Sequence, residues 1–102
     1  MAKFLAAAEE ELVNAATVYE QTAVGLGGRL LDEIERTLTL LQRHPLAGRS
    51  VLPQWRGRAI RSILLPHFPF RIVYVAEPEL LIVAVAHLRR RPAYWRRGRE
   101  PR

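Results

Sequence analysis

The stretch Phe68–Leu88, FPFRIVYVAEPELLIVAVAHL, decides the fold predicted for this chain. It holds two apolar runs of strand length, Phe70–Ala76 and Leu80–Leu88, separated by the short segment Glu77-Pro78-Glu79. Branched and aromatic residues favour strands, and a short proline-containing segment suits a tight reversal. The stretch therefore predicts two antiparallel strands whose side chains alternate between the two faces of a sheet.

A third strand is predicted at Arg58–Leu65, which has a similar composition and is separated from Phe70 by Pro66-His67-Phe68-Pro69. Upstream of it, the segment Leu46–Gly57 (LAGRSVLPQWRG) has two glycines, one proline and no clean period. We interpret this segment as a connection with turns, in which Trp55 anchors a loop. The three strands together predict an antiparallel meander.

Two amphipathic helices precede the strands. In the first, apolar residues recur every three or four positions from Leu5 to Tyr19. The second should end near Arg43, because the next residue precedes a proline. Its apolar stripe consists of Leu26, Leu30, Ile34, Leu38 and Leu41. The sequence thus predicts an α+β fold, with an N-terminal helical hairpin packed on a small antiparallel sheet, in a single domain that spans residues 1–102.

The composition narrows the class of protein. The chain has no cysteine, so a disulfide framework and a thiolate metal site are excluded, and we expect a soluble cytoplasmic protein. The longest apolar run, Leu80–Ala86, is far shorter than the roughly 18 residues that would suggest a membrane span. The histidines lack close ligand spacing, so neither a metal nor another cofactor is expected.

Charge is distributed unevenly along the chain. Residues 1–48 carry four bases and seven acids, whereas residues 49–102 carry twelve arginines and three acids. The basic second half should attract an anionic partner, which could be a phosphate backbone or an acidic protein segment. A solvated surface with no partner is the simpler alternative.

The last predicted strand runs into a basic and aromatic tail, His87–Trp95 (HLRRRPAYW). Its charge should lie at the rim of the sheet, and Pro92 should turn the chain back. We interpret Tyr94 and Trp95 as packing a short C-terminal helix or tail against the sheet, with stacking on a nucleobase as the alternative. His87 is either a half-buried structural residue or an acid–base group.

These segments resemble the RelE/ParE superfamily of small bacterial toxins from type II toxin–antitoxin pairs. The resemblance rests on FPFRIVY at Phe68–Tyr74 and IVAVAHLRRRPAYW at Ile82–Trp95, and it extends back over both helices to Ala8 and to the strand around Arg61. Relatives have a helical hairpin on an antiparallel sheet, as predicted here. They usually begin with an edge strand, for which this chain offers only Lys3-Phe4-Leu5, so that strand is expected to be short, displaced or absent.

The resemblance implies one of two activities. ParE-like toxins poison DNA gyrase, whereas RelE-like toxins cut ribosome-bound mRNA without a metal. A ribonuclease of this kind would use Arg61, Arg71, His87, Arg90 and Tyr94. The match fails around Arg61, where the ribonuclease branch has closely spaced lysines and this chain has none. Arginine is a poor proton shuttle, so the ParE-like branch is favoured, and a non-toxic nucleic-acid-binding module is the third hypothesis.

The resemblance also implies two sets of contact residues and no cofactor. The residues expected to contact the target are Arg71, His87, Arg89, Arg90, Arg91, Tyr94, Trp95, Arg96 and Arg97. Those expected to contact a cognate, ParD-like antitoxin in a hetero-oligomer are Leu30, Ile34, Leu38, Leu41, Arg61 and Arg71. The antitoxin would bind through an acidic, amphipathic C-terminal segment that lies along the apolar stripe of the second helix.

Overall fold

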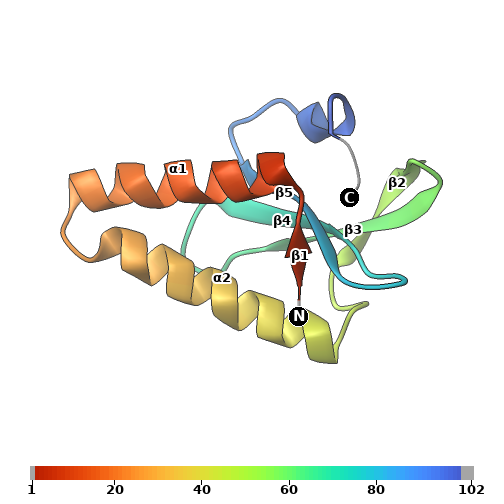
Figure 1. Cartoon of the computed structure of the whole chain (residues 1–102), viewed down its shortest axis with the longest axis horizontal. Helices are drawn as coiled ribbons and strands as arrows, with labels where there is room; N and C mark the ends of the chain where they lie inside the picture. The colour runs from red at the N-terminus through yellow and green to blue at the C-terminus, as the bar shows by residue number, and fades with distance from the viewer. Residues whose placement is uncertain (1, 100–102) are drawn as a thin grey trace.

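The computed structural model describes residues 2–99 and contains two helices packed on a five-stranded mixed sheet (Figure 1). The elements are β1 (Lys3–Phe4), α1 (Ala6–Thr22), α2 (Leu26–Arg43), β2 (Arg49–Trp55), β3 (Arg58–Leu64), β4 (Phe70–Val75), β5 (Leu81–His87) and the 3-10 helix η1 (Tyr94–Arg96). The strand order is β1-β5-β4-β3-β2. The predicted α+β fold is confirmed.

The two helices form the predicted hairpin, and one side chain fixes the turn between them. The carboxylate of Glu20 accepts hydrogen bonds from the backbone N–H groups of Gly25, at 2.8 Å, and Gly27, at 3.0 Å. These bonds satisfy donors that the start of α2 would otherwise leave unpaired. A Cβ atom on Gly27 would collide with the backbone oxygen of Ala16, so glycine allows the helices to approach closely here. In the described part of the chain, neither helix is long and apolar enough to cross a membrane.

The core lies between the hairpin and the central strands. Ile72 and Tyr74 of β4, and their partners Val85 and Ile82 of β5, are almost fully buried. The ring of Tyr19 on α1 packs edge-on against Phe70 of β4, with the ring centroids 6.3 Å apart. Because side chains alternate along β4, the residues between these core positions, beginning with Arg71, point to the other face of the sheet.

Two details of the sheet differ from the prediction. Arg49–Trp55 is not a loop but the edge strand β2, which pairs antiparallel with β3, and Trp55 is a buried strand residue. The N-terminal strand is short, as expected, with the two residues Lys3 and Phe4, but it pairs parallel with β5, so the sheet is mixed where an antiparallel one was predicted. The meander β3-β4-β5 is present with antiparallel pairing, as predicted.

Candidate functional site

A pocket of about 110 Å³ lies between the sheet and the C-terminal segment. It brings together six of the predicted target-contact residues, namely Arg71, His87, Arg90, Arg91, Tyr94 and Trp95. Arg71 pairs with Ala86 across β4 and β5, and both residues line the pocket. The floor of the pocket is therefore the face of the sheet that points away from the Tyr19 contact, and its wall is the chain after β5.

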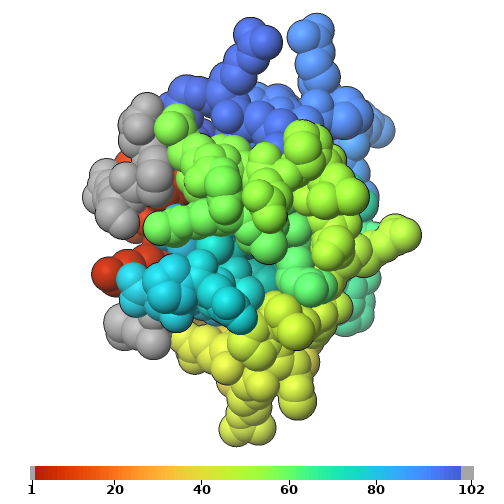
Figure 2. All heavy atoms as spheres, turned by 90° about the vertical axis from the view of Figure 1, so that its right-hand side faces the viewer, coloured from red at the N-terminus to blue at the C-terminus, as the bar shows by residue number. Residues whose placement is uncertain are grey.

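The chain after β5 turns back over the sheet through local backbone hydrogen bonds. The N–H of Arg90 donates to the oxygen of His87 at 3.0 Å, and the N–H of Tyr94 donates to the oxygen of Arg91 at 3.2 Å. Trp95 is then buried in the core. Arg96 donates to the backbone oxygens of Pro53 at 2.7 Å and Gln54 at 3.3 Å, so the tail is fixed to β2. Figure 2 shows the C-terminal segment resting on the β2–β3 hairpin.

An ion pair between Glu11 and Arg99 joins α1 to the chain that follows η1. The guanidinium of Arg99 donates to both carboxylate oxygens of Glu11, at 2.9 and 2.8 Å, and Tyr94 donates its hydroxyl proton to the same carboxylate. The side chains of Arg99 and Glu11 are only 9% and 17% exposed. Bidentate pairing with little exposure is the strongest form of an arginine–carboxylate contact.

The same pair protects the edge of β5. Beyond β1, the N–H of Val85 donates to the carboxylate of Glu11 at 3.1 Å, and Arg99 donates to the oxygen of Val83 at 2.8 Å. An unpaired strand edge would otherwise expose backbone donors and acceptors. The two side chains therefore take the place of a neighbouring strand where β1 ends.

The protonation of Tyr94 is set by this environment. Burial, together with the hydrogen bond to Glu11 and the negative charge of Glu11, raises the pKa of Tyr94 to about 12. The hydrogen bonds to Glu11 likewise raise the pKa of Arg99. Both groups keep their protons at neutral pH, and the hydroxyl of Tyr94 is already engaged as a donor. This tyrosine positions its neighbours and has no proton that it can easily give up.

His87 is half-buried at the end of β5. Its Nδ1 accepts a hydrogen bond from the backbone N–H of Arg89 at 3.0 Å, and its ring packs edge-on against Phe70 with the centroids 5.1 Å apart. Nε2 is left as the ring atom available to a ligand. Arg90 and Arg91 line the pocket and are exposed, so its rim is cationic. Arg89 and Arg97 are also exposed but do not line the pocket.

Arg61 does not lie with the other predicted site residues. Its guanidinium donates to the backbone oxygen of Gly48 at 2.8 Å, and it lines a different cavity, with Leu46 and Glu77. Beside it, Tyr74 donates to the oxygen of Pro45 and accepts from the N–H of Gly48. Arg61 thus holds the connection between α2 and β2, and the five-residue ribonuclease set is not assembled at one site.

The apolar stripe on α2 that was predicted to contact the antitoxin is mostly buried within the chain. Leu30, Ile34 and Leu41 are 0%, 2% and 0% exposed, and Leu38 is half-buried. These side chains belong to the core of the protein and offer no surface to a partner. The regular spacing of apolar residues along α2 arises because that face of the helix is buried against the chain's own sheet, which is the commoner cause of such spacing.

Sequence reasoning missed Glu11 and Arg99. Glu11 is the third of three consecutive glutamates, and Arg99 is one of many arginines, so neither stands out by residue type. A second omission is the pair of Glu33, which is 4% exposed, and His67 in the β3–β4 turn. Glu33 accepts from the backbone N–H of His67 at 2.8 Å and contacts its Nδ1 at 2.7 Å.

Comparison with models of known protein families identifies a match to this chain. A family model described as "ParE toxin of type II toxin-antitoxin system, parDE" matches residues 2–92. No curated protein and no solved structure matches the chain. The matched range contains Arg71, His87 and Arg90 and ends just before Tyr94.

Proposed function

Because the chain belongs to the family of ParE toxins of type II toxin–antitoxin systems, we propose that it arrests growth by binding and poisoning DNA gyrase in the cytoplasm. Residues 1–102 form a single toxin domain in this proposal, and a cognate ParD-like antitoxin neutralises it in a hetero-oligomer. The observation that carries the proposal is the cationic pocket under the tail, in which Arg71, Arg90 and Arg91 meet.

This pocket suits recognition of an anionic or acidic surface. Arginine presents a planar fork of donors that pairs with carboxylates and phosphates, and three such groups around one small cavity fix both charge and geometry. We assign the contact with the target to this rim. The assignment covers Arg71, His87, Arg90 and Arg91 of the pocket and extends to the exposed Arg89 and Arg97, with Tyr94, Trp95 and Arg96 holding the rim in place.

The chemistry of the pocket supports binding over cleavage. Strand scission without a metal needs a base for the 2′-hydroxyl and an acid for the leaving oxygen. Tyr94 has a pKa of about 12 and donates to Glu11, and Arg61 is held elsewhere. A RelE-type ribonuclease remains the second candidate because His87 lines the same pocket as Arg71 and Arg90, which could stabilise a phosphorane.

The antitoxin is proposed to cover the same rim. An acidic segment would pair with the exposed arginines and with Arg71, and would block the target sterically as well as by charge. This replaces the apolar stripe of α2 as the expected antitoxin surface, since Leu30, Ile34 and Leu41 are buried.

The deciding experiment is induction of the gene without an antitoxin, followed by measurement of labelled DNA and protein synthesis over the first minutes. The proposal expects DNA synthesis to stop first, and expects purified protein to inhibit supercoiling by gyrase. Arg71→Ala and Arg90→Ala should lose both effects while remaining folded. Arg43→Ala, at the exposed end of α2, is the matched control and should retain them. If protein synthesis stops first, the ribonuclease candidate replaces the gyrase proposal.

A further inference from the structure

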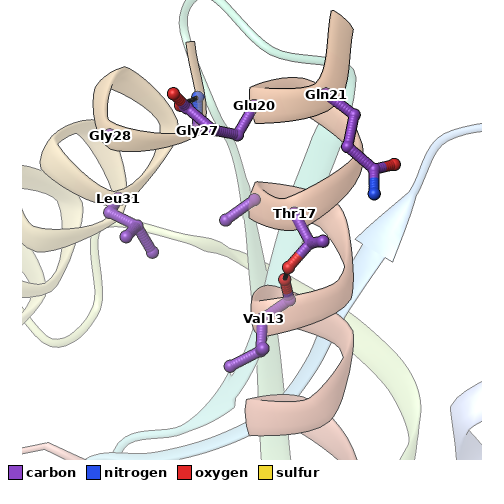
Figure 3. A pocket seen from close by; sticks show the side chains of 8 residues that line it. Val13, Thr17, Glu20, Gln21, Gly27, Gly28 and Leu31 are labelled. Atoms are coloured by element: carbon purple, nitrogen blue, oxygen red, sulfur yellow. Dashed lines mark hydrogen bonds between the residues drawn. The ribbon is translucent and has the colours of Figure 1, made fainter. Parts of the chain in front are cut away.

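The helical hairpin carries an apolar groove on its exposed side, away from the cationic rim. The groove has a volume of about 450 Å³. It is lined by Val13, Ala16, Thr17, Glu20 and Gln21 of α1 and by Gly27, Gly28 and Leu31 of α2. Figure 3 shows Val13 and Leu31 pointing into the space between the two helices. Val13 is 55% exposed and Leu31 is 44% exposed, so nothing in the described chain covers them.

Two of the three polar side chains that line the groove are engaged within the chain, and the third, Gln21, extends away from the space between the helices (Figure 3). Both oxygens of Glu20 accept hydrogen bonds from the N–H groups of Gly25 and Gly27 at the start of α2, and the hydroxyl of Thr17 donates to the oxygen of Val13. A small polar ligand needs a few unsatisfied polar groups that converge on it. The groove is therefore suited to apolar side chains of another protein.

Gly28 gives a second and independent indication of a partner. A Cβ atom at Gly28 would meet no heavy atom within 4 Å, and no positive φ requires glycine there. Glycine is less favourable than alanine in a helix because it loses more backbone freedom on folding. The fold of this chain therefore does not need the glycine. Its effect is to leave the floor of the groove open for a closely approaching segment.

The charge around the groove identifies the kind of segment. The sequence of α1 contains four acids and no lysine or arginine. Glu11 is paired with Arg99 and Glu20 is bonded to the start of α2, so Glu9 and Glu10 supply the exposed charge. Glu9 lies one turn before Val13 and Glu35 lies one turn after Leu31, on the same sides of their helices, and both are exposed. Arg29 and Arg36 of α2 line a different cavity beside His67, and Arg36 also lines one with Glu35.

We propose that this groove is a docking surface for an amphipathic helix with a narrow apolar row and lysines or arginines on its flanks. The apolar row packs between Val13 and Leu31 over Gly28, and the basic flanks face Glu9 and Glu35, in the helix-in-groove mode of recognition. A second copy of this chain would place two acidic hairpins face to face, which like charges oppose. The surface is distinct from the rim assigned to the target, so this proposal does not depend on the proposed function.

The test uses the purified full-length chain and two synthetic helical peptides of about 18 residues, long enough to form a helix in isolation. The peptides share one leucine–alanine row and differ only in flanks of lysine or glutamate. The lysine peptide should bind at least about tenfold more tightly, and should shift the NMR signals of Val13 and Leu31. Gly28→Leu should abolish this binding, because its side chain fills the groove, while the thermal midpoint stays at or above that of the parent.

The control variant is Gly28→Ala, which adds one methyl group and should keep most of the binding. Equal or tighter binding of the glutamate peptide would overturn the proposal in favour of an acidic partner. Concentration-dependent dimers that Gly28→Leu disrupts would assign the groove to a second copy instead. Unchanged binding of the lysine peptide to a folded Gly28→Leu protein would show that the groove is not the contact surface.

Discussion

The guanidinium carbon of Arg90 lies 3.9 Å from the centroid of the Tyr94 ring. The hydroxyl of the same ring donates to Glu11, which also forms the bidentate pair with Arg99. The position of an exposed rim arginine is thus linked, through one aromatic ring, to an ion pair between α1 and the tail. A stacked guanidinium keeps its donors free in the plane of the fork while its rotation is restricted.

Tyr94 is therefore expected to act through its ring more than through its hydroxyl. Tyr94→Phe should keep the stacking on Arg90 and lose one hydrogen bond, lowering the free energy of unfolding by about 1 kcal/mol without abolishing growth arrest. Tyr94→Leu should abolish growth arrest because Arg90 loses its support. Growth curves after induction and denaturant unfolding of both variants check this. A toxic Tyr94→Leu variant would contradict the positioning role.

Glu11→Ala is expected to destabilise the protein strongly. It leaves the guanidinium of Arg99 without its carboxylate and removes the acceptor of the Val85 N–H. Breaking a largely buried pair by removing one partner costs about 3–5 kcal/mol. Glu10→Ala, one position earlier and exposed, is the control and should change the free energy of unfolding by less than about 0.5 kcal/mol. Equal losses from the two variants in urea titrations would contradict the structural role of Glu11.

Gly48→Ala should also be destabilising, for a steric reason. A Cβ atom at this position would lie 2.6 Å from the hydroxyl oxygen of Tyr74 and 2.7 Å from the backbone oxygen of Ser62. Relieving the clash would break the bonds by which Tyr74 holds the α2–β2 connection, at a cost of about 1–3 kcal/mol. Gly28→Ala, which meets open space, should be neutral or stabilising by comparison. Thermal unfolding of the two variants should therefore show shifts of opposite sign or very different size.

The sequence predicted the elements that have a clear period. The strands that contain Phe70–Val75 and Leu81–His87 and the helix that ends at Arg43 are confirmed close to their expected bounds. The edge strand Arg49–Trp55 was missed because most of its residues are exposed on both faces, so they show no alternation, and Pro53 interrupts it. This edge strand is stabilised by its pairing with β3, and the local pattern of residues in the sequence does not reveal such pairing.

The site was predictable only in part, for a related reason. Charge and strand parity place Arg71 and the arginines after His87 around one pocket, because these residues are near each other in the meander. The contact of Glu11 with Arg99 joins residues 88 positions apart, which no local spacing indicates. The stripe of α2 was assigned to a partner because periodicity identifies an apolar face but cannot tell which molecule covers it.

The pair of Glu33 and His67 predicts a dependence of stability on pH. Burial alone would raise the pKa of Glu33, but the hydrogen bonds from the backbone and ring of His67, together with the charges of His67 and Arg36, outweigh it and lower the pKa. A carboxyl whose pKa is lower in the folded state is stabilising above its unfolded pKa, and this contribution is lost as the pH falls through the folded pKa. The stabilisation should therefore be full above about pH 5 and decline below it.

The measurement is the difference in free energy of unfolding between the parent and Glu33→Gln from about pH 7 to pH 3, which should shrink toward the acid end. Glu35→Gln, exposed on the same helix, should give a small difference that does not change with pH. A difference for Glu33→Gln that stays constant over this range would show that the carboxylate charge is not what holds the β3–β4 turn to α2.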